Sequence, residues 1–439
     1  MKKIVLLSTV VSTMLLATNG DVMIGHGPKS TGMAGVGIAV SHGAESALSN
    51  AAMIRSVKNS EFTGSATMFA PDVNFASNAG ANATPAEQGG AYPNSAPTSF
   101  SKSDADFSII PDFSYATRLN EHTVVGLTID GTAGLGVDYQ GKRSSGAFDM
   151  QTALQIAKVG VPIAYTLPNS GLTLAVEPIM QYSTLKMNYM TPMGASSNSE
   201  ESSVDFGFEL GMAYDIGNWT FGAVYQSIIK SNYKGNISNA LRDFGIQSIT
   251  SGDNLDQPAE TGVGIAYRKD RSTFGLDYRS IHWRDTKGYE DFGWKDQDVI
   301  AVGYRYDAPS WVLRLGYNHG DSPIRERNAQ AGGQEGYENA AINFFNLSGF
   351  PATVEDHYTI GGDYKLADNL DLSFAFVYSP ETTTTFDTTG MTQGMVMQGA
   401  MAQGASEADA GAAAAGASGS TASVAHSQKA LTLGATYRF

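Results

Sequence analysis

The residues best suited to chemistry in this chain occur in spacings that match no catalytic site. The stretch GMAGVG, from Gly32 to Gly37, resembles a dinucleotide-binding loop, but no strand precedes it and its third glycine is misplaced. The 7 His residues show no metal-ligand spacing such as His-x-x-x-His. No Gly-x-Ser-x-Gly nucleophile motif is present. We therefore expect no enzyme activity, no metal and no cofactor.

The charged residues are few and mostly acidic. They make up 16% of the chain, below the roughly 25% of soluble domains. A net charge of −15 excludes the basic surface that nucleic acid requires, so we expect no nucleic-acid partner. The chain has no cysteine, which is ordinary in the bacterial envelope and unusual for a large secreted eukaryotic protein.

Apolar residues recur at every second position almost everywhere in the chain. We therefore expect β-strands to position most of the side chains. In WVLRLGY, Trp311, Leu313 and Leu315 share one face, and Val312 and Arg314 the other. The final residues, LTLGATYRF, alternate in the same way up to a terminal aromatic. One face is large and aromatic, and the other is small, polar or charged. This pattern, in a chain of 439 residues, favours a membrane β-barrel with its apolar face in lipid and a polar lumen.

The N-terminus has the features of an export signal. Met1-Lys2-Lys3 precedes an apolar run to Ala17, and small residues follow up to Gly20. The alternative is a membrane anchor, but the run is shorter than the ~20 residues that a spanning helix needs. We interpret residues 1–20 as a signal peptide cleaved after Ala17 or Gly20.

Turn signals divide the rest of the chain into about fourteen strands, an even number as bacterial barrels require. Tight turns such as Asn120-Glu121 and Lys269-Asp270 alternate with long connections. We expect the tight turns to be periplasmic and the long connections to be outer loops, including a low-complexity loop at about 382–426. The strands are predicted to begin near Glu61, Phe107, His122, Gln151, Leu172, Val204, Trp219, Glu260, Thr273, Asp298, Trp311, Val354, Leu370 and Gln428.

The segment before the first strand does not alternate. Gly27 to Ile54 is rich in Gly, Ala and Ser, too short for a domain and long enough to fold into the lumen. We therefore divide the chain into a signal peptide at 1–20, a hatch or plug at 21–59 and a transmembrane antiparallel β-barrel of about 14 strands at 60–439, which makes the fold class all-β.

Several stretches in this order resemble the FadL family of outer-membrane transporters. They are the Gly27–Ile54 segment, APDVNF at Ala70 to Phe75, Tyr225 to Ser238, Gly316 to Ile324 and Gly349 to Tyr364. The chain departs from the family at Asn50-Ala51-Ala52, where family hatches commonly carry Asn-Pro-Ala. A proline there would stiffen the turn.

The resemblance implies passive uptake of long-chain fatty acids or other hydrophobic compounds across the outer membrane of a Gram-negative bacterium. Outer loops capture the ligand, the hatch shifts, and the ligand leaves sideways through a kinked strand. The outer-membrane lipid and lipopolysaccharide are then partners, and we expect a monomer. The hatch residues implied are Gly32, Gly35, Gly37, Asn50 and Ala51.

Two further groups of residues fit this route. Gly131, Gly134 and Gly136 in the third strand would permit the kink, although glycine also gives barrel strands twist or close packing. An apolar cluster in an outer loop would capture the ligand, although it could instead pack against a neighbouring loop. The cluster comprises Phe344, Phe345, Leu347 and Phe350.

A fatty-acid carboxylate would require a cation, and arginine pairs with carboxylates through two hydrogen bonds. Arg279, Arg305, Arg314 and Arg438 are predicted to face the lumen. The alternative is that they pair with lumen acids such as Asp277, Asp363 and Asp371. Three other functions remain open: a porin for polar solutes, a surface adhesin or structural barrel, and, last, an outer-membrane lipase.

Overall fold

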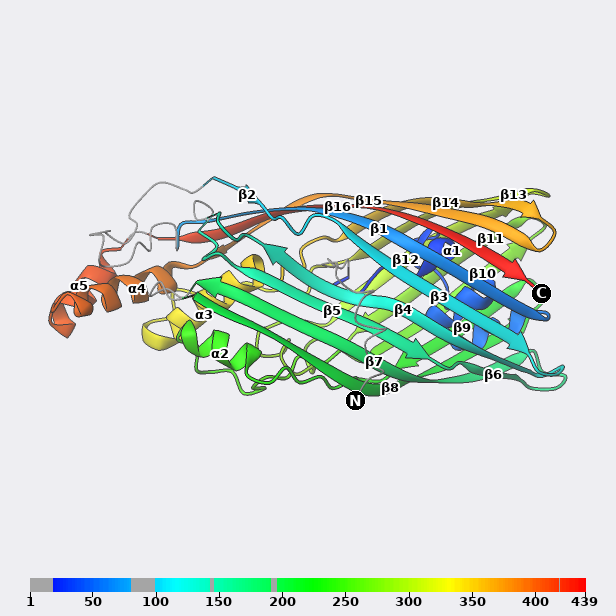
Figure 1. Ribbon diagram of the computed structural model, residues 1–439, viewed down its shortest axis with the longest axis horizontal. Coiled ribbons are helices and arrows are strands. Elements are labelled where there is room, and N and C mark those ends of the chain that lie inside the picture. Colours follow the sequence, from blue (N-terminus) through cyan, green and yellow to red (C-terminus); the bar gives the residue numbers. More distant parts are fainter. Residues whose placement is uncertain (1–18, 80–98, 143–145, 191–195, 418) are drawn as a thin grey trace, which may run out of the picture.

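The computed structural model describes residues 19–79, 99–142, 146–190, 196–417 and 419–439, which form one closed antiparallel barrel (Figure 1). The sheet has sixteen strands, but β2 is a two-residue strand beside β1, and β5 and β6 are two parts of one wall strand. The wall therefore has fourteen strands, which confirms the prediction. Strand β16 pairs with β1 along its whole length and closes the barrel.

Consecutive wall strands are neighbours in the sheet, joined by tight turns at one end and by longer connections at the other. The strands are β1 Ser60–Ser77, β2 Ser101–Lys102, β3 Ser108–Arg118, β4 Thr123–Asp138, β5 Gln151–Gly160, β6 Ile163–Thr166, β7 Leu172–Met190, β8 Ser196–Ile216, β9 Trp219–Gln226, β10 Glu260–Lys269, β11 Ser272–Ile281, β12 Gln297–Asp307, β13 Trp311–Gly320, β14 Asp356–Ala367, β15 Leu370–Asp387 and β16 Thr421–Arg438.

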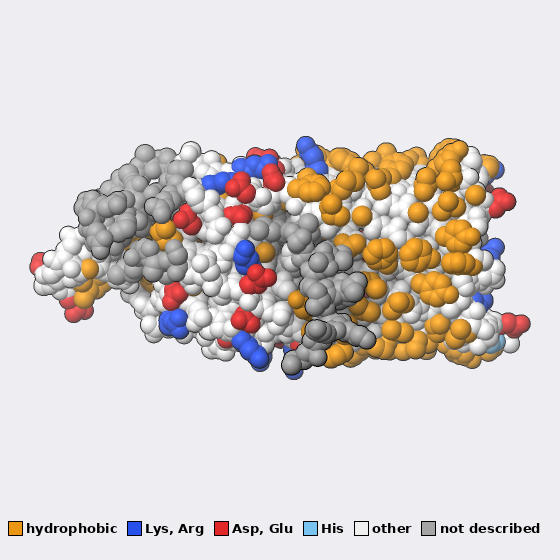
Figure 2. Space-filling model, viewed as in Figure 1, with side chains coloured by type: hydrophobic (Ala, Val, Ile, Leu, Met, Phe, Trp, Pro, Cys, Tyr) orange, Lys and Arg blue, Asp and Glu red, His pale blue; other side chains and the backbone are white. Residues whose placement is uncertain are grey.

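The alternation of side chains separates lipid from lumen as predicted. On β16, Leu433 is 49% exposed, whereas its neighbour Thr432 is 0% exposed and faces inward. Figure 2 shows the outward hydrophobic side chains as a band around the half of the barrel that carries the tight turns. Charged side chains gather beyond this band, towards the long connections. The band is the surface that the hydrocarbon core of a membrane would cover.

Three strands are longer than the sequence predicted. Strand β8 begins at Ser196 rather than near Val204, and β16 begins at Thr421 rather than near Gln428. Strand β15 continues to Asp387, so the connection after it is 388–420 and not 382–426. These extensions lie beyond the apolar band, where both faces of a strand can be polar. The alternation that reveals a strand in lipid is therefore missing there.

One wall strand is interrupted between β5 and β6, at Val161 and Pro162. Pro162 has no N–H to donate to the sheet, so the regular ladder stops there. Its carbonyl still accepts a hydrogen bond from Gly126 of β4 at 2.9 Å, and β6 resumes the pairing with β4 and β7.

The helices lie in two places (Figure 1). Inside the barrel are α1 (Gly27–Thr31) and the 3₁₀ helices η1 (Gly43–Leu48) and η2 (Ala51–Ser56). At the end with long connections are α2 (Asn236–Asp243), α3 (Gly333–Ser348), α4 (Thr389–Ala402) and α5 (Glu407–Ala415). In the part of the chain that the structure describes, no helix is both long enough and apolar enough to cross a membrane.

We predict that Leu433→Arg destabilises the barrel by about 2–4 kcal/mol, because the substitution places a charge on the lipid face of β16. The measurement is the urea midpoint of folding into lipid vesicles. Met401→Arg is the matched control, since Met401 is similarly exposed (48%) but lies on α4 outside the apolar band. An equal loss in both variants would contradict the assignment of the lipid face.

Candidate functional site

Residues 27–56, which we call the hatch, fill the lumen towards the end with tight turns (Figure 1). The hatch packs directly on the wall because the facing wall residues include glycines. A Cβ on Gly222 of β9 would lie 2.0 Å from the Ile38 carbonyl oxygen, and one on Gly316 of β13 would lie 2.4 Å from the Met33 carbonyl carbon. Any larger residue at these two positions would push the hatch away from the wall.

Buried wall carboxylates hold the hatch by its backbone. Asp277 of β11 accepts hydrogen bonds from the Gly37 and Ile38 amides, both at 2.8 Å. Three other wall carboxylates each accept one hatch amide. They are Glu209 with Ala51 at 2.9 Å, Glu61 with Ala44 at 2.8 Å and Asp112 with Gly27 at 3.1 Å. The hatch therefore has polar attachments to β1, β3, β8 and β11.

The five predicted hatch residues all lie inside the barrel. Gly35 has φ of +89°, and a Cβ there would lie 1.8 Å from the Ile24 carbonyl oxygen, so only glycine fits. Gly32 accepts a hydrogen bond from the Thr359 hydroxyl at 3.1 Å. Asn50 caps η2 through Ala52 N–H and donates to the Ile38 carbonyl at 2.8 Å.

Ala51, where family hatches commonly carry proline, makes a hydrogen bond through its backbone N–H. The Ala51 N–H donates to Glu209, a hydrogen bond that proline could not make. The turn that a proline would stiffen is held instead by the Asn50 side chain and by this attachment to the wall.

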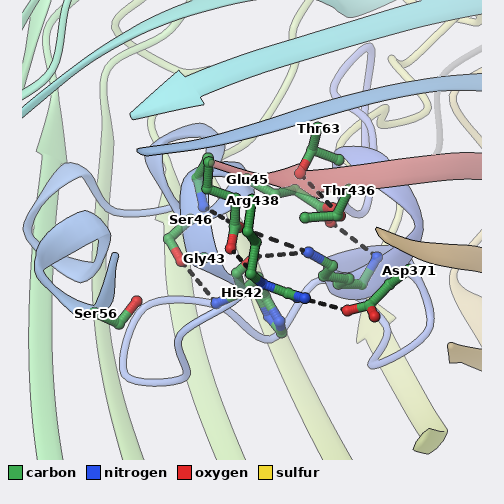
Figure 3. A network of polar contacts seen from close by, with 12 residues as sticks. His42, Gly43, Glu45, Ser46, Ser56, Thr63, Asp371, Thr436 and Arg438 are labelled. Atoms are coloured by element: carbon green, nitrogen blue, oxygen red, sulfur yellow. Dashed lines mark hydrogen bonds and ion pairs between the residues drawn. The ribbon is translucent and has the colours of Figure 1, made fainter. Parts of the chain in front are cut away.

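Ionisable groups are also buried within the hatch. The Glu45 carboxylate accepts the Lys29 and Ser30 amides at 2.8 and 3.0 Å. Burial raises the pKa of Glu45 to about 7, against the opposing effect of the Lys29 charge. Burial lowers the pKa of His42 to about 3, so its ring is neutral at physiological pH. Figure 3 shows His42 and Ser46 close to the pair formed by Arg438 and Asp371 of the wall.

The wall is interrupted beside the predicted kink in β4. Strands β3 and β4 pair only from Arg118–Val124 to Asp112–Asp130. Beyond Asp130, β4 continues beside β5, with a shift of register between Gly131 and Ala133. A Cβ on Gly131 would lie 2.6 Å from the Ile110 side chain of β3. Gly134 and Gly136 follow where the pairing with β5 is regular again, and a Cβ on Gly136 would lie 2.4 Å from the Thr152 carbonyl oxygen.

The segment that precedes the hatch lies against β4 at this interruption. The Gly134 amide donates to the Asp21 carbonyl at 2.9 Å, and the Met23 amide donates to the Thr132 carbonyl at 3.3 Å. The Asp21 carboxyl accepts hydrogen bonds from Tyr289 and Gln257, which belong to two of the long connections. Burial raises the pKa of Asp21 to about 6. The signal peptide predicted at 1–20 lies almost entirely outside the described residues, and its cleavage position stays a prediction.

The predicted capture residues are packed rather than exposed. Phe344, Phe345 and Leu347 belong to α3 and are at most 1% exposed, and Phe350 follows at 7%. Phe345 packs against Phe244 with ring centroids 4.7 Å apart. The alternative of packing between loops therefore describes this structure. A small pocket remains at this place, lined only by apolar side chains: Met187, Ile237, Ala240, Leu241, Leu255, Phe292, Phe345 and Phe350.

The four predicted arginines lie near lumen acids. Arg314 forms two hydrogen bonds with Asp363, at 2.7 and 2.6 Å. Arg438 contacts Glu61 and Asp371 (Figure 3). The predicted partnership with Asp277 is wrong, because that carboxylate holds the hatch. The other two arginines have different partners: Arg305 pairs with Asp307 at 3.0 Å, and Arg279 lies 3.9 Å from Glu260.

A polar cavity of about 60 Å³, which we call the central cavity, lies beside the hatch and the β4 interruption. It is lined by the carboxylates Asp130, Glu177, Glu209 and Glu260, and by Lys158 and Arg279. A larger opening of about 590 Å³ lies at the end with tight turns, and Arg55, Arg118 and Asp215 are among its lining residues.

Sequence reasoning missed the wall acids that anchor the hatch and the contacts of Asp21. Asp277, Glu209 and Glu61 look like ordinary lumen-facing residues, and their partners are backbone amides more than 15 residues away. The sequence does show an acidic residue on the polar face of a strand. It does not show which group donates a hydrogen bond to that residue.

The closed barrel, its apolar outer band and its hatch-filled lumen define the class of outer-membrane transport channels. A family model described as "Outer membrane protein transport protein (OMPP1/FadL/TodX)" matches residues 9–332. The chain belongs to this family and to the outer membrane of a Gram-negative bacterium. Family members are channels rather than enzymes.

Solved structures share the fold at low sequence identity. A Pseudomonas aeruginosa FadL homologue is 14% identical with a TM-score of 0.65, covering 97% of this chain and 99% of its own. The P. putida toluene transporter TodX is 15% identical with a TM-score of 0.61, covering 95% and 99%. The Ralstonia pickettii toluene transporter TbuX is 15% identical with a TM-score of 0.58, covering 95% and 99%. A search of curated protein sequences found no match.

We predict that Asp277→Ala loosens the hatch, because two buried amides lose their acceptor at a cost of about 1–3 kcal/mol each. Hydrogen exchange of the Gly37 and Ile38 amides should accelerate. Asp277→Asn should behave more like the parent, since it keeps one acceptor oxygen. Asp298→Ala, which removes an exposed carboxylate from β12, is the control. Unchanged exchange in Asp277→Ala would mean that these two hydrogen bonds do not restrain the hatch.

Proposed function

We propose that this protein carries hydrophobic small molecules, such as long-chain fatty acids or hydrocarbons, passively across the outer membrane. They are captured among the outer loops, pass when the hatch moves, and leave sideways into the lipid. The observation that carries the proposal is the interrupted pairing of β3 and β4 beyond Asp112–Asp130. The toluene transporters among the similar structures act on hydrophobic molecules of this kind.

The capture step is supported by the apolar pocket under α3. Phe345 and Phe350 line it together with residues of α2, and no polar side chain contributes. A hydrophobic solute gains roughly 25 cal/mol for each Å² of apolar surface that it removes from water. The pocket is small, so we propose that a ligand enters by displacing these loop side chains, as flexible outer loops allow.

The hatch must move for any solute to pass. The central cavity, at about 60 Å³, holds only a few water molecules. The hatch closes the lumen beyond it through its contacts with Gly222 and Gly316. A lumen filled in this way argues against a general porin, which keeps an open aqueous channel. Gly32, Gly35, Gly37, Asn50 and Ala51 are the residues that we expect to set the closed position.

The exit step uses the kink at Gly131, Gly134 and Gly136. A hydrophobic molecule has no reason to enter the aqueous periplasm, since it gains ~0.8 kcal/mol for each CH₂ buried in lipid. Beyond Asp130, β4 still pairs with β5 but no longer with β3. Its Gly134 amide and Thr132 carbonyl bond instead to Asp21 and Met23. Displacing residues 21–23 would open a passage between β3 and β4 without breaking a regular strand pair.

We also propose that the protein acts as a monomer, because one chain closes its own barrel and contains the whole route. We propose that the charged side chains beyond the apolar band contact lipopolysaccharide (Figure 2). We keep the domain bounds of 1–20, 21–59 and 60–439 as part of this proposal, with the outer connection after β15 at 388–420.

The experiment is a disulfide across the proposed exit. An ideal Cβ on Gly131 lies 3.9 Å from the Ile110 Cβ, within the range of disulfides, and the chain has no other cysteine. We predict that oxidised Ile110→Cys/Gly131→Cys loses uptake of a hydrophobic fluorescent probe, down to the level of membranes without the protein. Reduction should restore the uptake.

The control pair is Thr67→Cys/Thr432→Cys, which staples the continuous β1–β16 seam where the two hydroxyls are 2.8 Å apart. Oxidation of this pair should leave uptake unchanged. Full uptake through the oxidised exit pair would refute lateral exit and favour a route past the hatch into the periplasm.

A further inference from the structure

The central cavity has an unbalanced set of charges. Four carboxylates line it, from Asp130, Glu177, Glu209 and Glu260, against two permanent cations, Lys158 and Arg279. The formal charge of these six side chains is therefore −2, or −1 when His26, which lies 3.7 Å from Asp130, is protonated. Each of the six comes from the wall, so movement of the hatch would leave the excess of negative charge in place.

The two cations already have partners. Arg279 lies 3.9 Å from Glu260, and Lys158 donates to the Gln226 side chain at 3.2 Å. A bound carboxylate would have to compete with Glu260 for Arg279 while lying close to three further carboxylates. At a few Å, the repulsion between like charges amounts to several kcal/mol in a protein environment.

The rest of the proposed route provides no more favourable binding site for an anionic ligand. The outer pocket under α3 has no charged lining residue. Arg305, Arg314 and Arg438 line a separate opening of about 270 Å³ on the other side of the hatch, where each pairs with an acid. A ligand that leaves between β3 and β4 does not pass that opening.

The cavity also contains a buried polar group that the head group of a ligand could satisfy. The Thr132 side chain lines the cavity, is 5% exposed and has a hydroxyl with no hydrogen-bond partner among the described residues. It lies on β4 directly after Gly131, at the proposed exit. A buried hydroxyl without a partner is costly, and a neutral hydroxyl or carbonyl of a ligand would satisfy it.

We infer that the central cavity selects uncharged hydrophobic molecules, including those with a neutral polar head, and rejects fatty-acid anions. Its specificity-determining residues are Asp130 and Glu260, which repel a carboxylate, and Thr132, which bonds a neutral head group. The inference rests on the proposed uptake of hydrophobic molecules and specifies which of them pass.

The test compares two ligands of equal chain length, 1-dodecanol and dodecanoate. Radiolabelled ligand binds to the full chain in lipid nanodiscs at pH 8, and binding to protein-free nanodiscs is subtracted. We predict that dodecanol binds about tenfold more tightly than dodecanoate, since one unfavourable charge contact of this kind amounts to at least a factor of ten. This comparison needs no variant and so does not depend on a substitution that impairs folding.

Glu260→Gln then tests the origin of the preference. The substitution removes one negative charge and removes the carboxylate that competes with a ligand for Arg279, which lies 3.9 Å away. It should narrow the ratio of the two affinities severalfold by tightening dodecanoate binding. Glu407→Gln is the matched control, because Glu407 is exposed on α5 outside the route, and it should leave the ratio unchanged.

The outcomes separate the two proposals. Binding of dodecanoate as tight as that of dodecanol, or tighter, would overturn the inference and leave hydrophobic uptake standing. An unchanged ratio in Glu260→Gln would also count against the charge mechanism. Saturable binding of neither ligand would refute the proposed uptake itself, and with it the inference.

Discussion

The structure depends on one constraint: each backbone N–H and C=O at membrane depth needs a partner within the protein, because lipid offers none. The pairing of β16 with β1 meets this requirement by removing both edges of the sheet. The same constraint gives meaning to the place where β3 and β4 separate. Beyond Asp130 on β4, the segment at Asp21 and Met23 supplies hydrogen bonds that a wall strand would otherwise make.

Closure of the barrel creates a second requirement, which is to fill the lumen without a conventional core. Small residues in the hatch and glycines in the wall allow backbone to approach backbone, as at Gly222 and Gly316. Wall carboxylates then satisfy hatch amides that would otherwise be buried without acceptors, as Asp277 does for Gly37 and Ile38. Attachments of this kind hold the hatch in position against the wall.

The environment changes in steps along the proposed route. The outer loops provide an apolar pocket around Phe345, and the central cavity is acidic. Beyond the hatch lie Arg305, Arg314 and Arg438, each beside an acid. Asp21 lies between the first two regions, because it contacts β4 through its backbone and two long connections through its carboxyl. A displacement of the outer connections can therefore reach the interrupted wall through this one residue.

The sequence by itself determined the barrel, its fourteen strands and the position of the hatch, because lipid imposes a strict period of two and Gly27–Ile54 lacks it. It also determined that Arg314 and Thr432 face the lumen. Tertiary structure alone decided which partners these inward side chains have. Asp277 binds the hatch rather than an arginine, Phe344 is buried rather than exposed, and the strand ends beyond the lipid band extend further than expected. The reason is physical: alternation records which side of a wall a residue faces, whereas contacts between the wall, hatch and loops join residues far apart in the chain and leave no local pattern.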